Sequence, residues 1–197
     1  LDGDLDLTIG YRAGNYYYGQ CMYAGQVRVY LNVNGTINPD HVWESENCDE
    51  VRDIAWFDVD QDGDEDLAIG SYQFWNSTKS NYELSPLKIY RNDAGIITST
   101  PVWTSETTYS THMLKTADFD GNGKDDIVFG TDDSSVYLIY DDGNIADGFP
   151  FIVSDAIQTA PSILDINGDK VIFVGTGAVI GIGQDNNLYA INSDGSL

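Results

Sequence analysis

The chain has 197 residues, of which 9 are Lys or Arg and 32 are Asp or Glu, so that its formal net charge at pH 7 is −23. This excess of negative charge argues against nucleic acid and anionic membrane surfaces as partners and favours cations. Hydrophobic residues make up 42% of the chain and aromatic residues 12%, as in a folded domain with a sizeable core. No apolar run reaches the length of about 18 residues that spans a bilayer, so we expect no membrane insertion.

The chain begins with the second half of a motif that later returns in full. The opening LDGDLDLTIG matches the end of DVDQDGDEDLAIG at 58–70, which returns as DFDGNGKDDIVFG at 118–130. The same register aligns VRVYLNVNG at 27–35 with LKIYRNDAG at 87–95. A weaker copy, ILDINGDKVIFVG, lies at 163–175. These matches indicate a repeat protein.

Each repeat is predicted to form four short strands separated by turn residues. In the second repeat the predicted strands lie near 52–58, 66–72, 87–92 and 101–106, where β-branched and aromatic residues are frequent. No segment has a helical period. Four-stranded units at this spacing are typical of β-propeller blades, each a twisted sheet that buries its faces against its neighbours.

The predicted fold is therefore all-β, a single β-propeller domain over 1–197 whose blades are four-stranded antiparallel sheets. The predicted blades cover about 1–46, 47–106, 107–154 and 155–197. The first lacks its first strand and the last lacks its fourth, which makes about 3.5 blades. We expect a part of a larger propeller, whose remaining blades belong to a parent chain or to another copy.

Carboxylates at alternate positions mark the loop between the first two strands of a repeat as a candidate cation site. Positions 1, 3, 5 and 9 are held by Asp58, Asp60, Asp62 and Asp66 in the second repeat and by Asp118, Asp120, Asn122 and Asp126 in the third. Gly63 and Gly123 at position 6 permit a tight or left-handed backbone. Oxygen-only ligands suit a hard cation, and an irregular, all-protein site favours Ca²⁺ over Mg²⁺. The alternative is a set of Asp/Gly turns without metal.

The other two copies of this loop are incomplete. The first keeps Asp2, Asp4 and Asp6, but positions 1 and 3 would precede Leu1, so its site is truncated. In the fourth, Ile163 and Val171 occupy positions 1 and 9, and we expect this loop to bind metal weakly or not at all. An EF-hand is excluded, since position 12 of the intact loops is Ile69 or Phe129 where a bidentate Glu is required.

The strings DVDQDGDEDLAIG and DFDGNGKDDIVFG resemble the calcium loops of FG-GAP/VCBS repeats, the blades of integrin-α-like β-propellers. In related loops position 7 contributes its backbone carbonyl, and here this position is held by Asp64, by Lys124 and, in the first copy, by Asp4. The resemblance implies a secreted or cell-surface, calcium-stabilised propeller that binds proteins or glycans, as in cell adhesion, or that accompanies a secreted enzyme.

Long aromatic segments separate the second and third predicted strands. YRAGNYYYGQCMYAG at 11–25 and SYQFWNSTKSNYELSP at 71–86 are predicted to lie as loops on the face opposite the calcium loops. The candidate ligand-binding residues are Tyr16, Tyr17, Tyr18, Tyr23, Phe74, Trp75 and Tyr82. Exposed rings of this kind suit sugar stacking or a protein hot spot. The alternative is that the rings form a local core.

Cys21 and Cys48 are expected on this same face, where a disulfide between them would agree with an oxidising compartment. Two buried free thiols are the alternative. Trp43 and Trp103, at matching places in two repeats, are predicted to pack between blades.

No catalytic constellation is recognisable. His41 and His112 have no Ser–Asp or Cys partner at a familiar spacing, so we predict that the chain is not an enzyme. The predicted function is a calcium-stabilised extracellular recognition module that binds a glycan or an extracellular protein through the aromatic loops. The alternatives are a structural scaffold and an accessory part of a larger secreted enzyme or adhesin.

Overall fold

A computed structural model describes residues 5–11, 25–45, 49–76, 79, 81–105, 110–177 and 186–197, with the backbone alone at 49, 74–76 and 82. All regular elements in these ranges are β-strands. Accordingly, the described part of the chain has no helix long and apolar enough to cross a membrane.

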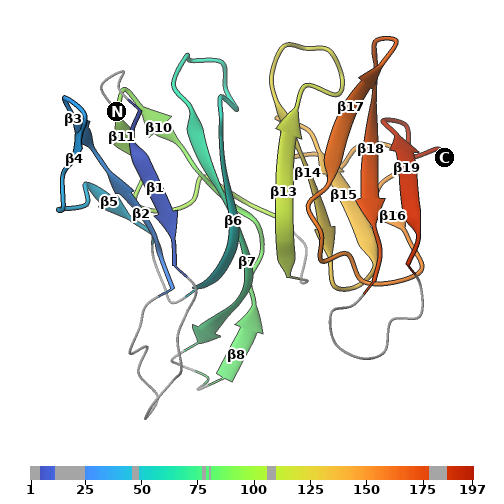
Figure 1. Ribbon diagram of the computed structural model, residues 1–197, viewed down its shortest axis with the longest axis horizontal. Helices are drawn as coiled ribbons and strands as arrows, with labels where there is room; N and C mark the ends of the chain where they lie inside the picture. The colour runs from blue at the N-terminus through green and yellow to red at the C-terminus, as the bar shows by residue number, and fades with distance from the viewer. Residues whose placement is uncertain are drawn as a thin grey trace.

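The strands form four antiparallel sheets, numbered here in chain order (Figure 1). Sheet 1 contains β1 (Leu7–Gly10), β2 (Val27–Tyr30) and β5 (Trp43–Glu44). Sheet 2 contains β6 (Asp49–Phe57), β7 (Asp66–Asn76), β9 (Lys88–Tyr90) and β12 (Trp103–Thr104), with β8 (Asn81–Leu84) paired to the far end of β7. Sheet 3 contains β13 (Thr111–Ala117), β14 (Asp126–Thr131), β15 (Ser135–Ile139) and β16 (Phe151–Ile152). Sheet 4 contains β17 (Ser162–Ile166), β18 (Asp169–Gly175) and β19 (Leu188–Asn192).

Two small hairpins extend the connections between the last two strands of sheets 1 and 2. They are β3 (Asn32–Val33) with β4 (Thr36–Ile37), and β10 (Asn92–Asp93) with β11 (Ile96–Ile97). Within each sheet, strands follow one another in space in the order of the chain, which confirms the predicted antiparallel, four-stranded units in sheets 2 and 3.

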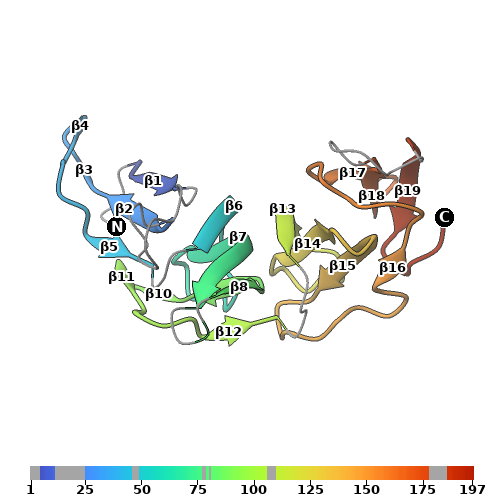
Figure 2. The same ribbon diagram turned by 90° about the horizontal axis from the view of Figure 1, so that it is seen from below.

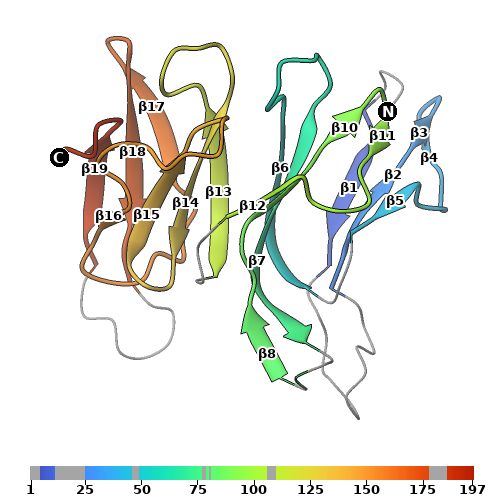
Figure 3. The ribbon, with the colours of Figure 1, turned by 180° about the vertical axis from the view of Figure 1, so that it is seen from behind.

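The four sheets stand side by side along an arc (Figure 2). The strands β6, β13 and β17 lie on its inner side, and β5, β12 and β16 lie on its outer side. Figure 3 shows the outer side, where β12 and the β10–β11 hairpin lie. The β6–β7 and β13–β14 loops lie at one edge of the arc, and the β7–β8 hairpin lies at the other (Figure 1).

The hydrophobic core is divided among the three interfaces between neighbouring sheets. Val27 and Val29 of β2 pack on Leu67, Ile69 and other residues of sheet 2. A second cluster joins sheets 2 and 3, and a third joins sheets 3 and 4. Every residue of β14 is buried, because this strand is covered on both faces. The arrangement follows from the sequence, since each sheet has apolar residues on both faces and can bury them only against neighbours.

The glycine that ends the loop motif allows neighbouring sheets to approach closely. A Cβ at Gly130 would lie 2.3 Å from Cγ2 of Ile157, which leads into the next sheet, and a Cβ at Gly10 would lie 2.7 Å from Cγ1 of Val51. Gly175 ends the fourth copy of the motif, and there a Cβ would meet nothing closer than Thr159 Oγ1 at 3.7 Å. The glycine is therefore needed where another sheet packs on it.

One loop prediction was wrong. The segment 71–86 was predicted to be a loop, but β7 continues to Asn76 and pairs with β8 in the register Gln73 to Leu84. The segment 72–75 is rich in strand-forming aromatic residues, so it extends the hairpin instead of ending the strand.

Trp43 and Trp103 confirm the predicted packing between sheets, since each lies against the core cluster shared with the next sheet. The indole N–H of Trp43 also donates a hydrogen bond across this interface, to the Thr98 carbonyl at 3.0 Å.

We predict that Gly130→Ala lowers the free energy of unfolding by about 1–3 kcal/mol, because the new methyl group overpacks against Ile157. Gly175→Ala is the matched control and should change stability by less than about 0.5 kcal/mol. Urea unfolding of both variants measures the difference. Equal effects would contradict the packing role of Gly130.

Candidate metal centre

The two intact loops, 58–66 and 118–126, fold in the same way. In each, the position 1 carboxylate accepts a hydrogen bond from the backbone N–H of position 6, at 3.0 Å from Gly63 to Asp58 and at 3.0 Å from Gly123 to Asp118. The glycines have φ angles of 94° and 89°, in the left-handed region that this turn requires. The loops are therefore wrapped around their own carboxylates.

Three carboxylates converge in each loop. One oxygen from each of positions 1, 3 and 9 lies within 4.8 Å of the others, in the groups Asp58, Asp60, Asp66 and Asp118, Asp120, Asp126. In the first group Asp58 Oδ1 is buried and has no hydrogen-bond partner among the described residues. A buried carboxylate oxygen without a donor is costly unless a cation binds it, so this donor set fits a hard divalent ion.

The aspartate at position 9 joins the loop to the sheet. Asp66 is fully buried, and its carboxylate accepts hydrogen bonds from Val59 N at 3.1 Å and from Asn92 N at 2.8 Å. Asp126 accepts the equivalent bonds from Phe119 N and Asp141 N. Each carboxylate thus fixes the start of its loop and the end of the third strand of its sheet, and its remaining lone pairs can still face a cation.

Burial raises the pKa of both position 9 carboxyl groups. For Asp126 it raises the pKa to about 6, although the two backbone N–H donors act in the opposite direction and Asp120 adds repulsion. For Asp66 burial likewise raises the pKa. Without a cation, the ionised form of each group is therefore less favourable in the folded loop than in water.

The side chains of the other predicted ligands, at positions 5 and 7, also make contacts within the protein. Asp62 Oδ1 and Asn122 Oδ1, at position 5, accept hydrogen bonds from the backbone N–H groups of position 7 at 2.9 and 2.8 Å. The Asp64 carboxylate accepts from Ala94 N at 2.8 Å, in the β10–β11 hairpin. The Lys124 ammonium pairs with Asp141 at 2.9 Å. The side chains at position 7 are thus engaged elsewhere, as expected if this position offers its backbone carbonyl.

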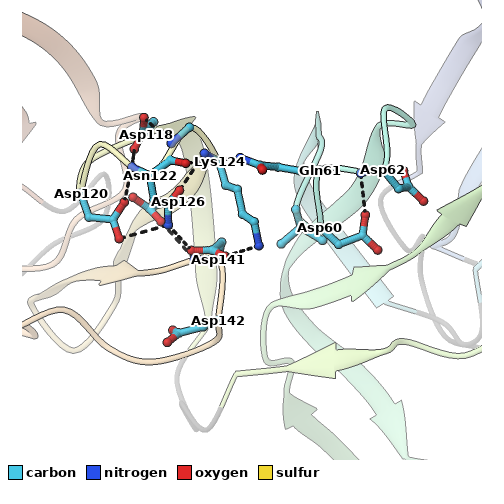
Figure 4. Close-up of polar contacts among 12 residues, drawn as sticks. Asp60, Gln61, Asp62, Asp118, Asp120, Asn122, Lys124, Asp126, Asp141 and Asp142 are labelled. Atoms are coloured by element: carbon cyan, nitrogen blue, oxygen red, sulfur yellow. Dashed lines mark hydrogen bonds and ion pairs between the residues drawn. The ribbon is translucent and has the colours of Figure 1, made fainter.

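The two loops also touch each other (Figure 4). Gln61 reaches across from sheet 2 and donates from Nε2 to the Asn122 carbonyl at 3.4 Å. Lys124 lies between the loops, and Asp141 beside it raises its pKa, with further contributions from Asp60 and Asp58. The acidic groups of both loops therefore form one electrostatic region.

The incomplete copies differ from the intact ones. The fourth is a tight hairpin in which Asn167 and Gly168, both with positive φ, connect β17 directly to β18. Asp165 there accepts from Gly168 N at 2.8 Å. In the first copy, Asp6 keeps the position 9 contact, accepting from Asn32 N at 2.8 Å, whereas Asp2 and Asp4 lie outside the described residues.

The predicted aromatic ligand site and disulfide lie largely outside the described residues. This applies to Tyr16, Tyr17, Tyr18, Tyr23, Cys21 and Cys48, and to the side chains of Phe74, Trp75 and Tyr82. For the last three only the backbone pairing is described, of Trp75 with Tyr82 and of Phe74 with Glu83 and Asp49. These assignments stay predictions.

A polar cluster that the sequence did not reveal lies at the end of sheet 3 where β13 begins and β14 ends. Asp132 accepts from Ser110 Oγ at 2.8 Å and from Gln158 Nε2 at 3.2 Å, and it lies 2.7 Å from His112 Nε2. Asp132 lies 20 to 26 residues from each of its three partners, and no motif connects them. Ser110 donates to the carboxylate and not to the histidine, so the cluster is not a nucleophile–base pair.

Comparisons with known proteins place the fold. The sequence matches no described protein family, and no curated protein matches it. Among solved structures, the crystal structure of BBS1N in complex with ARL6DN, soaked with lead, superposes with a TM-score of 0.55 at 14% identity, over 86% of this chain and 46% of that one. The same complex soaked with mercury gives 0.54 and 13%, over 86% and 43%.

Both neighbours are β-propeller domains. The chain is a β-propeller. It spans less than half the length of the solved chains, and at this identity the likeness concerns the fold alone. In this propeller the four sheets are the blades, and the loops 58–66 and 118–126 lie at one end of adjacent blades (Figure 1).

We predict that Asp132→Asn destabilises the propeller at pH 7 by about 1–3 kcal/mol. Burial acts to raise the pKa of Asp132, but hydrogen bonds from His112, Ser110 and Gln158 outweigh it and lower the pKa to about 2. Its stabilising contribution is therefore present above pH 4 and is lost as the pH falls through about 2.

Urea unfolding at pH 7 and at pH 2 measures this contribution. The difference between wild type and variant should shrink at the lower pH, while the exposed control Asp169→Asn should show little effect at either. A difference that persists unchanged at pH 2 would contradict the assignment.

Proposed function

We propose that the chain is a calcium-stabilised recognition module, with propeller blades of the FG-GAP/VCBS type, that binds a protein ligand. The calcium assignment rests on Asp58 Oδ1, which is buried without a hydrogen-bond donor among the described residues and belongs to a group of three converging carboxylates. The same geometry recurs at Asp118, Asp120 and Asp126, which supports a shared role for both loops.

Calcium suits these loops better than magnesium. Ca²⁺ accepts six to eight oxygen ligands in flexible geometry, whereas Mg²⁺ demands a near-ideal octahedron and keeps several waters. The loops supply three carboxylates each, and the position 5 oxygen and position 7 carbonyl complete an irregular, all-oxygen set. The bound ion would supply positive charge that offsets the repulsion among these carboxylates.

The residues of each loop then have separate tasks. Positions 1 and 3 bind the ion, and position 9 binds the ion and the two backbone N–H groups that fix the loop to the blade. Because Gln61 also connects the two loops, the ions would hold adjacent blades in register. We infer that the ion has a structural role. It would stabilise the shape of the surface that recognises the ligand.

Two observations favour a protein ligand. The neighbours of similar fold were solved in complex with a protein, ARL6DN. The net charge of −23 favours a partner with basic groups. A glycan bound through the aromatic loops is the second candidate from the sequence. The FG-GAP/VCBS resemblance supports the further proposal that the module acts outside the cell or on its surface, without catalysis of its own.

We predict that Ca²⁺ at about 100 times its Kd stabilises the chain by about 2.7 kcal/mol per site, which raises the Tm by about 5–10 °C. Asp58→Asn should remove the contribution of one loop, and the combination with Asp118→Asn should remove both. Calorimetry in calcium and in chelator measures the shift.

Asp165→Asn, in the tight hairpin of the fourth copy, is the matched control and should leave the calcium response unchanged. An identical Tm of wild type in calcium and in chelator would exclude the metal assignment.

A further inference from the structure

A cavity of about 230 Å³ lies between sheets 2 and 3, next to the two acidic loops. Its walls are mainly apolar and comprise Phe57, Ile89, Val102, Trp103, Ile127 and Ile139. The β7–β8 hairpin lies at the opposite end of the blades, so this site is separate from it (Figure 1). The cavity also differs from the metal sites, because Asp60 is the only member of the two converging carboxylate groups among its lining residues.

The cavity exists because one repeat departs from the pattern of the previous one. Between sheets 1 and 2, Trp43 packs edge-to-face on Tyr90 with ring centroids 5.0 Å apart. Between sheets 2 and 3, Ile139 takes the place of Tyr90, since Tyr90 pairs with Leu67 and Ile139 pairs with Ile127 sixty positions later. The smaller side chain leaves space beside Trp103, the counterpart of Trp43.

Trp103 also lacks the polar partner of its counterpart. The Thr98 carbonyl that accepts from Trp43 follows the β10–β11 hairpin, and the described part of sheet 3 has no such hairpin between β15 and β16. Among the described residues, the indole N–H of Trp103 has no hydrogen-bond partner. The indole N–H is therefore paired at Trp43 but available to a ligand at Trp103.

The rim of the cavity is acidic. Asp60, Asp125, Asp141 and Asp142 surround it, and Figure 4 shows Asp141 and Asp142 on the side of sheet 3 that faces Asp60. Lys124 neutralises Asp141, and Arg91 at the rim is paired with Asp93. Asp125 has no ion pair or hydrogen bond among the described residues, and Asp142 accepts only from Asn144. These two carboxylates remain for a cationic ligand.

We propose that this cavity is the anchor site for an arginine or lysine side chain of a protein partner, an inference that rests on the proposed recognition function. The long apolar stem of such a side chain fits the apolar walls, while its charged head stays at the rim with Asp125 and Asp142. The free N–H of Trp103 is available to a carbonyl of the bound segment. The cavity is smaller than the roughly 300–1,000 Å³ of small-molecule sites, and so it suits one anchoring side chain.

The test follows the four Trp indole N–H signals of the ¹⁵N-labelled full chain by NMR in calcium. The Trp103 signal is assigned with Trp103→Phe. The probe is acetyl-Gly-Arg-Gly-Gly-amide, with the Lys, Gln and Glu peptides as comparisons. We expect the Arg and Lys peptides to shift the Trp103 signal saturably, and the Gln and Glu peptides to bind at least fivefold more weakly.

Two variants test the walls and the rim separately. Ile139→Tyr restores the residue of the previous repeat, fills the cavity beside Trp103 and should weaken Arg-peptide binding at least tenfold. The double variant Asp125→Asn with Asp142→Asn should weaken Arg-peptide binding at least fivefold. These substitutions lie at the rim, so their effect does not depend on repacking of the core. Asp169→Asn with Asp194→Asn removes the same charge from exposed positions of sheet 4 and should have little effect.

The outcomes separate this proposal from the calcium assignment, because the Tm response to calcium is measured on the same sample. A normal calcium response with no shift of the Trp103 signal would overturn the anchor site and leave the calcium assignment standing. Equal binding of the Arg and Glu peptides would also overturn it. Binding of n-butylguanidine as tight as that of the Arg peptide would contradict the role assigned to the peptide carbonyl.

Discussion

The buried aspartate at position 9 of the loop motif is the constraint on which the arrangement of the blades depends. Asp66 and Asp126 each accept two backbone N–H groups, one from the start of the loop and one from the end of the third strand. Such a residue fixes the loop to its sheet, but it places a carboxylate where burial disfavours its charge. The proposed cation would resolve this conflict, because it would offset the buried charge while the hydrogen bonds remain.

Differences between repeats carry more functional information than their similarities. The intact loops share the same backbone path, and the fourth copy, which lacks an acid at position 9, has contracted to a tight hairpin. Sheets 1 and 2 close their interface with Trp43 and Tyr90, whereas sheets 2 and 3 leave a cavity beside Trp103. The propeller thus places the two acidic loops and an unfilled pocket at the same end of adjacent blades.

The repeat spacing was sufficient to predict the strands, their order and the candidate metal loops. Strands predicted near 52–58 and 66–72 correspond to β6 and β7, because local patterns of strand-forming residues and turns determine them. The continuation of β7 into the β7–β8 hairpin was missed, because the aromatic residues of 72–75 were assigned to a ligand-binding loop although they favour a strand. The Asp132 cluster and the cavity were also missed. Both depend on contacts between segments that are distant in the chain, for which a single sequence has no spacing signal.

The most direct measurement is crystallography of the full chain grown in calcium, with anomalous difference maps after exchange of the calcium for terbium. We expect one peak among Asp58, Asp60 and Asp66, a second among Asp118, Asp120 and Asp126, and no peak at the Asn167–Gly168 hairpin. Well-ordered loops without a peak at either group, in crystals grown at millimolar calcium, would contradict the claim that these carboxylates hold a cation.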